Sequence, residues 1–193
     1  MTMADDPFAP VREVASLMRS YGSPWYVAGG WAIDLFLGYR TRVHEDVDVA
    51  IFRVDQRRLR ESFPEWRFAK IEGRRPVPWT RQEWLRPPVH EIHAADPARG
   101  TRVEFLMDES SEGLWRFRRD PTVTRAVNRI AHVRWGLPFL APEIVLLYKA
   151  KTPTPKDERD FDAVRPALRP EPRAWLRNAL AVCHPGHMWT SRL

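Results

Sequence analysis

Three acidic residues lie in two apolar segments at a spacing that suits a divalent cation. Asp46 and Asp48 are two positions apart in the run 46–52, and Glu104 lies in a second run, 102–107. Side chains two apart on a strand share a face, so the aspartates would point the same way. Their carboxylates would repel each other, and a hard ion such as Mg²⁺ accepts oxygen ligands and removes that cost. The pattern therefore predicts magnesium ligands.

Glu104 could act in either of two ways. If its strand lies next to that of the aspartates, it becomes a third magnesium ligand or a general base for an attacking hydroxyl. The alternatives are that Glu104 simply faces solvent and that the aspartates form a calcium loop or a solvated strand end. A calcium loop of the EF type needs further oxygen ligands and a glycine that this segment lacks, which favours magnesium.

A glycine pair lies between the strand predicted at 25–28 and the helix predicted at 31–37. Without side chains, Gly29 and Gly30 allow the backbone to approach a phosphate closely, and the helix start supplies free N–H donors. No G-x-G-x-x-G or Walker pattern surrounds the pair. An ordinary turn is therefore the alternative.

Hydrophobic spacing predicts the elements that carry these residues. An antiparallel pair is expected where residues 96–100 provide turn chemistry. The stretch 73–88, with Trp79 and Trp84, is expected to be a long irregular loop whose tryptophans either stack on a sugar or base or anchor the loop. The expected strands are 25–28, 46–52, 66–71, 89–94 and 101–107, with one or two more within 115–134. The expected helices are 11–21, 31–37, 56–63, 143–150, 157–168 and 171–182.

Two of these segments together indicate a protein family more specifically than either segment does alone. Residues 28–34 read A-G-G-W-A-I-D and residues 41–48 read T-R-V-H-E-D-V-D. This combination resembles the polymerase-beta-like nucleotidyltransferases, and more narrowly the aminoglycoside 2''-nucleotidyltransferase and lincosamide nucleotidyltransferase group, in which a G-G-W helix precedes an H-x-D-x-D strand. Trp31 stands where many other members of the superfamily have serine, which narrows the subfamily.

The resemblance covers most of the chain and implies a fold. Residues 140–151 and 156–161 are similar to the helices that follow the catalytic sheet in that group, whereas 73–88 matches no part of it. The implied fold class is α+β, a mixed sheet flanked by helices and followed by a C-terminal helical segment. We expect a catalytic domain at 1–138 and the helical segment at 139–193.

The resemblance also implies roles for individual residues. Gly29 and Gly30 would hold the triphosphate of a nucleotide, Asp46 and Asp48 would bind Mg²⁺, and Glu104 would occupy the family's third acidic position. The implied reaction transfers AMP from ATP, or another nucleoside monophosphate, to a hydroxyl of a small molecule and releases pyrophosphate. Further phosphate contacts, each of which could equally be a surface charge, are Arg42, His44, Lys149 and Lys151.

The sequence constrains the chemical identity of the acceptor less than that of the nucleotide donor. Aminoglycosides are polycations, which suit an acidic cleft better than a chain of net charge +6. Lincosamides and other sugars stay possible. Residues that could form a local acidic wall are Glu45, Glu91, Asp108 and Glu109.

Other partners follow from the basic surplus, in which only four of 31 basic residues are lysines. Guanidinium groups bind phosphate in a bidentate manner, although codon composition alone explains arginine usage equally well. A toxin-like nucleotidyltransferase that modifies RNA or protein, or a non-catalytic nucleic-acid-binding module, is the alternative. Structural zinc at His90-x-x-His93 or at residues 183–187 lacks a convincing four-ligand pattern.

Features of the whole chain favour a cytoplasmic location. The single Cys183 has no partner for a disulfide within the chain. Asp5 and Asp6 stand where a signal peptide would carry positive charge. No apolar run approaches the roughly 20 residues of a membrane helix, so we expect no membrane partner.

Overall fold

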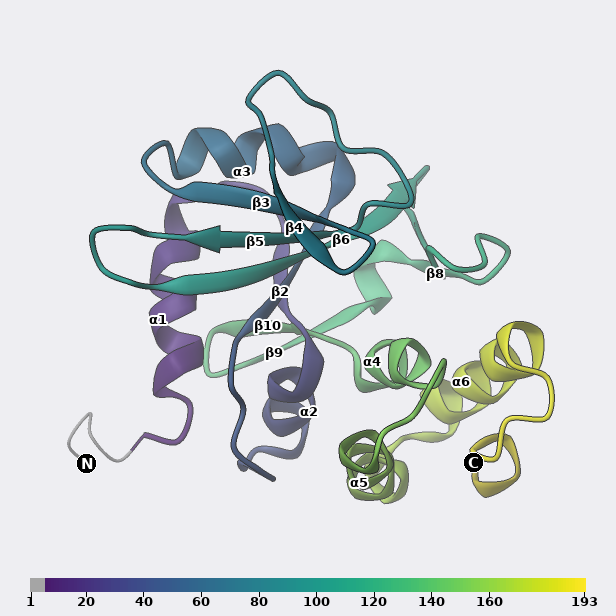
Figure 1. Ribbon diagram of the computed structural model, residues 1–193. Coiled ribbons are helices and arrows are strands. Elements are labelled where there is room, and N and C mark those ends of the chain that lie inside the picture. Colours follow the sequence, from purple (N-terminus) through teal and green to yellow (C-terminus); the bar gives the residue numbers. More distant parts are fainter. Residues whose placement is uncertain (1–5) are drawn as a thin grey trace.

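The computed structural model describes residues 6–193, and Asp5 lies outside that range. One mixed sheet forms its centre; of the six α-helices in the described part, α1 and α3 lie along the sheet and α2, α4, α5 and α6 group at one side of it (Figure 1). The strands are β1 (Trp25–Val27), β2 (Asp48–Phe52), β3 (Arg67–Glu72), β4 (Arg75–Pro78), β5 (Glu91–Ala95), β6 (Arg102–Ser111), β7 (Leu114–Arg116), β8 (Thr124–Ala126), β9 (Ala131–Arg134) and β10 (Leu137–Leu140). The helices are α1 (Ala9–Leu17), α2 (Gly29–Leu37), α3 (Gln56–Ser62), α4 (Pro142–Lys149), α5 (Pro155–Val164) and α6 (Pro170–Cys183).

The strand order places the two acid-bearing strands side by side. The main path of the sheet runs β4-β3-β5-β6-β2-β1-β10-β9, with β7 paired to β6 and β8 to β7. β2 is parallel to β6 and β1 is parallel to β10, while the remaining pairs are antiparallel. The predicted mixed sheet with flanking helices and C-terminal helices is confirmed.

The C-terminal helices group beside α2 rather than spreading over the sheet (Figure 1). α2 packs against α4 and α5, and α4 packs against α5 and α6. Along α4 the residues from Pro142 to Leu147 are all buried, which makes α4 the central helix of this group. Full burial of a valine, leucine or isoleucine side chain, as at residues 144–147, stabilises the fold by about 1.5–3 kcal/mol each. The start of α2 and the end of α4 are thereby held close to each other.

The stretch 73–88, predicted to be irregular throughout, contains β4. Glu72 pairs with Arg75, and the two residues between them, Gly73 and Arg74, have φ angles of 55° and 69°. Two successive positive φ angles define the tight turn that joins twisted antiparallel strands. Because β4 is an edge strand, its prolines remove no ladder hydrogen bond that a neighbour needs. The prediction of an irregular loop was wrong for β4, because Pro76 and Pro78 were interpreted as interrupting regular secondary structure.

The two tryptophans of this stretch differ in environment. Trp79 is buried, its indole N–H donates to the Glu83 carbonyl at 3.0 Å, and its ring packs edge-on against Phe68. Trp84 is exposed and lies under the Arg57 guanidinium. Trp79 therefore anchors the loop, as one of the two alternatives predicted.

Other differences concern the number of strands and the ends of elements: three strands, β7, β8 and β9, lie where one or two were expected, and β10 was not predicted. β2 begins at Asp48, so Asp46 lies in the connection before the strand, and α2 begins at Gly29 instead of Trp31. No helix within residues 6–193 combines the length and apolar character needed to cross a membrane.

Candidate active site

Parallel pairing of β2 with β6 brings the predicted acids together. Asp48 lies directly opposite Glu104 in the register, so both side chains project from the same face of the sheet. Asp46 is held two residues before β2, where its carbonyl accepts a hydrogen bond from the Trp31 indole at 2.9 Å. The expected adjacency of the two strands is therefore observed.

The acids affect each other's ionisation. Burial, followed by the charges of Asp46 and Glu104, raises the pKa of Asp48 to about 7, and the Lys149 ammonium only partly opposes this. Burial also raises the pKa of Glu104, with Asp46 and Glu91 adding to the shift and His93 opposing it. In the described chain, the carboxylates of Asp46 and Asp48 make no hydrogen bond or ion pair. A crowded set of unpaired oxygen donors fits a hard divalent cation.

The glycine pair is packed so closely that no side chain would fit. Gly29 has φ 58°, and a Cβ atom there would lie 2.0 Å from Asp48 Oδ2. A Cβ atom at Gly30 would lie 2.4 Å from an Arg42 guanidinium nitrogen and 2.4 Å from His44 Cε1. The start of α2, with its free N–H groups, is thus in direct contact with an acid and two basic residues.

A polar cavity of about 390 Å³ opens over this contact, with a group of cations along one side. Lys149 at the end of α4 pairs with Asp157 at 2.6 Å and with Asp160 at 2.9 Å. Asp160 also lies 3.6 Å from the Arg42 guanidinium. Positive charge next to helix N–H groups is suited to bind a polyphosphate. The cavity is lined by Gly29, Gly30, Arg42, Val43, His44, Glu45, Asp46, Asp48, Lys149, Lys156 and Arg159.

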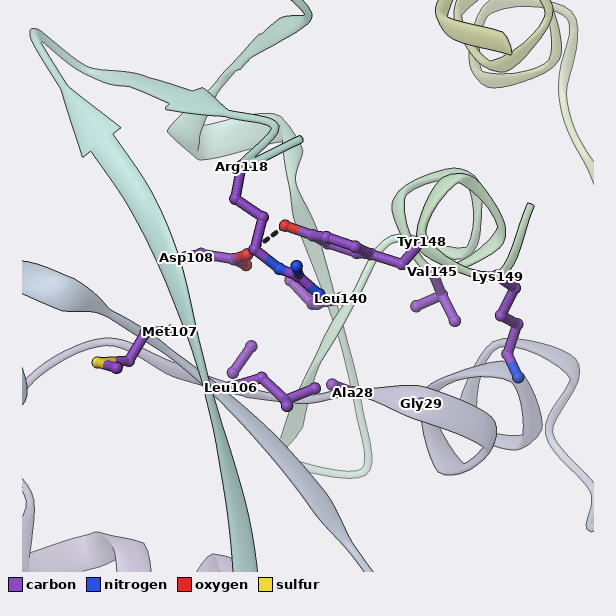
Figure 2. A pocket seen from close by; sticks show the side chains of 11 residues that line it. Ala28, Gly29, Leu106, Met107, Asp108, Arg118, Leu140, Val145, Tyr148 and Lys149 are labelled. Carbon is purple, nitrogen blue, oxygen red and sulfur yellow. Dashed lines mark hydrogen bonds between the residues drawn. The ribbon is translucent and has the colours of Figure 1, made fainter. Parts of the chain in front are cut away.

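A second, mainly apolar cavity of about 170 Å³ adjoins the first, because Gly29 and Lys149 line both. Ala50 and Leu106 lie one same-face step beyond Asp48 and Glu104 along their strands. Figure 2 shows Tyr148 of α4 reaching across this cavity to Asp108. The tyrosine hydroxyl donates to the carboxylate at 2.6 Å, and burial raises the pKa of Asp108 to about 6.

Comparison with known proteins identifies the family of this chain. A family model described as aminoglycoside-2''-adenylyltransferase matches residues 10–135. The chain belongs to this family. Its members are nucleotidyltransferases, which supports an enzymatic activity. No curated protein sequence matches the chain.

Solved structures of this class share the fold at low sequence identity. The crystal structure of ANT(2'')-Ia in complex with adenylyl-2''-tobramycin has a TM-score of 0.60 and 13% identity, covering 89% of this chain and 95% of that one. Lincomycin-bound LnuA, a lincosamide antibiotic adenylyltransferase, has a TM-score of 0.57 and 12% identity, covering 82% and 96%.

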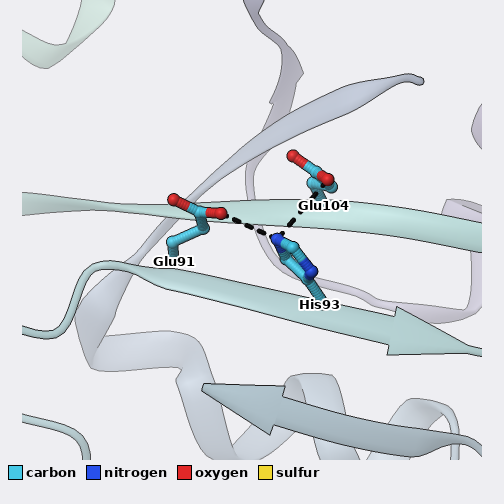
Figure 3. A group of neighbouring side chains, drawn as sticks. All are labelled: Glu91, His93 and Glu104. Atoms are coloured by element: carbon cyan, nitrogen blue, oxygen red, sulfur yellow. Dashed lines mark hydrogen bonds and ion pairs between the residues drawn. The ribbon is translucent and has the colours of Figure 1, made fainter. Parts of the chain in front are cut away.

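A group of three side chains extends the acid cluster toward β5 (Figure 3). His93 Nε2 lies 2.7 Å from Glu91 and 3.4 Å from Glu104. Within residues 6–193 this is the one group of three or more histidine, cysteine or acidic side chains whose ligand atoms all lie within 4.8 Å of one another, and the predicted set of Asp46, Asp48 and Glu104 does not meet this spacing. Neither candidate zinc pattern assembles, and His90 instead donates from Nδ1 to the Pro88 carbonyl at 2.9 Å.

Other residues predicted to contact the substrates are not brought to the candidate site. Lys151 lies exposed beyond α4, beside His184, and does not line the polar cavity. Of the expected acidic wall, Asp108 is buried beneath Tyr148 and Glu109 pairs with Arg53. Only Glu45 and Glu91 of that set lie near the acid cluster.

Several functional candidates were missed at the sequence level. Lys156 and Arg159 line the polar cavity, and their three-residue spacing just after Pro155 was the available signal, since such positions share a helix face. Asp160 had no local signal, because its partners Lys149 and Arg42 lie on other elements.

Proposed function

We propose that this adenylyltransferase family member transfers AMP from ATP to a hydroxyl of a small antibiotic of the aminoglycoside or lincosamide type. The observation that carries the proposal is the placement of Asp48 opposite Glu104, directly against Gly29. The site then combines acidic oxygens, helix N–H donors and cations around one cavity. These are the components that a phosphoryl-transfer reaction requires.

In the proposed reaction, the acceptor oxygen forms a bond to the α-phosphorus while the bond to the β-phosphate oxygen breaks. Pyrophosphate leaves, and the hydroxyl proton passes to Glu104. Asp46 and Asp48, with Glu104, would hold Mg²⁺, which when bound stabilises charge on the attacking and leaving oxygens.

The remaining groups would bind and orient the nucleotide. The backbone at Gly29 and Gly30 would contact the phosphates, with Arg42 and Lys149 neutralising their charge. His44, Lys156 and Arg159 line the same cavity. The adjoining apolar cavity would take the nucleoside. The catalytic part, 1–138, would thus supply the acids and the segment 139–193 most of the cations.

The acceptor would approach from the side of Glu91 and His93. ANT(2'')-Ia and LnuA were crystallised with adenylyl-2''-tobramycin and lincomycin, respectively. Acidic groups at Glu45 and Glu91 would favour an acceptor with amino groups. ATP as donor agrees with the cytoplasmic location that the lone cysteine predicts.

The test is transfer of label from α-labelled nucleoside triphosphates in the presence of Mg²⁺. Each of the four triphosphates is offered with tobramycin, with lincomycin, with RNA and with bulk protein, and Asp48→Asn serves as the inactive control. Label on a drug, dependent on Mg²⁺ and Asp48, is the expected result. Label on RNA or protein alone would establish the toxin-like alternative, and no transfer to any acceptor would contradict the proposal.

A further inference from the structure

Helix α2 contains a fully buried aspartate that takes no part in the proposed chemistry. Asp34 has 0% exposure, and an ionised carboxylate at such a depth is costly unless hydrogen bonds replace its water. Its Oδ1 accepts hydrogen bonds from the Thr41 backbone at 3.1 Å and from the Thr41 hydroxyl at 2.6 Å. Its Oδ2 lies 2.6 Å from His44 Nε2. Asp34 therefore holds the connection between α2 and β2 at two points.

A second residue of α2 holds the same connection further along. Trp31 lies three positions before Asp34, which places both on one side of the helix. Its indole N–H donates to the Asp46 carbonyl at 2.9 Å, and its ring centroid lies 4.5 Å from that of His44. The segment 41–46 is thus attached to α2 at Thr41, His44 and Asp46.

The residues that this attachment orients are those facing the polar cavity. A Cβ atom at Gly30 would lie 2.6 Å from His44 Nδ1, so the ring nitrogen that Asp34 leaves free lies against the glycine turn. Arg42, between the two anchored residues, lies against the same glycine. A carboxylate that binds one imidazole nitrogen fixes the orientation of the ring and its tautomer.

We propose that Asp34 is a positioning residue for nucleotide binding: through its contact with His44 Nε2 it holds the imidazole ring against the glycine turn, on the wall of the polar cavity that would receive the phosphates of the donor. This rests on the proposed function, because it assumes that the polar cavity receives a triphosphate. Asp34 acts through His44 and has no contact with the reacting atoms.

The test measures ATP binding directly, by calorimetry with Mg²⁺, and separates KM from kcat in the transfer assay. Asp34→Asn has the same size and keeps an acceptor for Thr41, but it places an amide N–H₂ opposite His44. We expect the Kd and KM for ATP to rise about tenfold, with kcat changing less than about threefold. Thr41→Val is the matched control: it removes a contact to the same carboxylate without touching the His44 contact, and it should leave Kd within about twofold.

A double-mutant measurement of ATP binding tests whether Asp34 acts through His44. In a His44→Ala background, Asp34→Asn should weaken ATP binding by less than about twofold, because its route to the phosphates is already removed. An undiminished tenfold effect in that background, or unchanged binding in Asp34→Asn alone, would overturn the inference while leaving the proposed function intact. If the wild-type protein binds no triphosphate at all, both fail together.

Discussion

The two sides of the site solve the problem of buried charge in opposite ways. On the sheet side, Asp46 and Asp48 face Glu104 without hydrogen-bonded or ion-paired partners of their own in the described chain. On the helical side, Lys149 is held between Asp157 and Asp160. The first arrangement is unfavourable until a cation arrives, whereas the second is complete before any ligand binds.

This difference indicates how the site divides its work. Crowded carboxylates destabilise the metal-free fold and would gain stability from a divalent ion. Cations already fixed by buried carboxylates lose little conformational freedom when phosphates arrive. Under the proposed function, the sheet side would bind the metal and the helical side would be preorganised for the nucleotide.

The largest expected effect comes from removing a charge on the sheet side. Asp48→Asn should lower label transfer by on the order of a thousandfold or more, because a metal ligand is lost. The same change should raise the melting temperature of the metal-free protein at pH 8 by about 2–4 °C, since it relieves repulsion. Transfer assays and thermal melts in chelator check both parts, and a lower melting temperature would contradict the comparison.

Next in size is the contact between the glycine turn and Asp48. Gly29→Ala places a methyl group 2.0 Å from Asp48 Oδ2, and the forced displacement should lower activity by about a hundredfold. Gly73→Ala is the matched control, because Gly73 has a similar φ of 55° but nothing within 4 Å of the added carbon. It should cost about 1 kcal/mol of stability and no activity. Equal losses of activity in both variants would mean that backbone strain alone is responsible.

A smaller effect is expected from breaking the helical side. Lys149→Met leaves Asp157 without its cation and Asp160 with only the more distant Arg42 guanidinium, and should lower the free energy of unfolding by about 3 kcal/mol. It should also raise the KM for ATP by about tenfold, since one phosphate partner is gone. Denaturant titration and steady-state kinetics measure these values. Unchanged stability would show that the helical side does not depend on its ion pairs.

The smallest effect is a pH dependence of stability on the sheet side. A folded pKa of about 7 for Asp48 lies above its ordinary value of about 4, so the folded, metal-free protein retains a proton that the unfolded chain releases. The associated stability is present below about pH 4 and is lost as pH rises through about 7. Wild-type melting temperatures should therefore fall over this window relative to Asp48→Asn. Saturating Mg²⁺ should reduce the slope, and parallel curves for the two proteins would contradict the assignment.

Local patterns were enough to predict much of this molecule. Alternation along residues 46–52 identified the aspartates, and the glycine pair before a helical run indicated the turn at the start of α2. The motif combination across residues 28–48 led to the family that the family model confirms. Each of these depends on neighbours in sequence, which the chain carries with it into any environment.

What local patterns could not supply is the set of long-range contacts. The pairing of Asp48 with Glu104 joins residues 56 positions apart, and it depends on which strands become neighbours in the sheet. The same holds for Asp160 beside Lys149 and Arg42, for Tyr148 on Asp108, and for the absence of Lys151 from the cavity lining.

The chain alone therefore determined which chemical groups exist and the short-range geometry of each, namely two aspartates on one segment and a glycine bend before a helix. Tertiary structure decided which groups share a cavity and which are neutralised before a ligand arrives. The physical reason is range: strand alternation and helix spacing act over a few residues, whereas burial, charge pairing and strand register arise only when distant segments pack together.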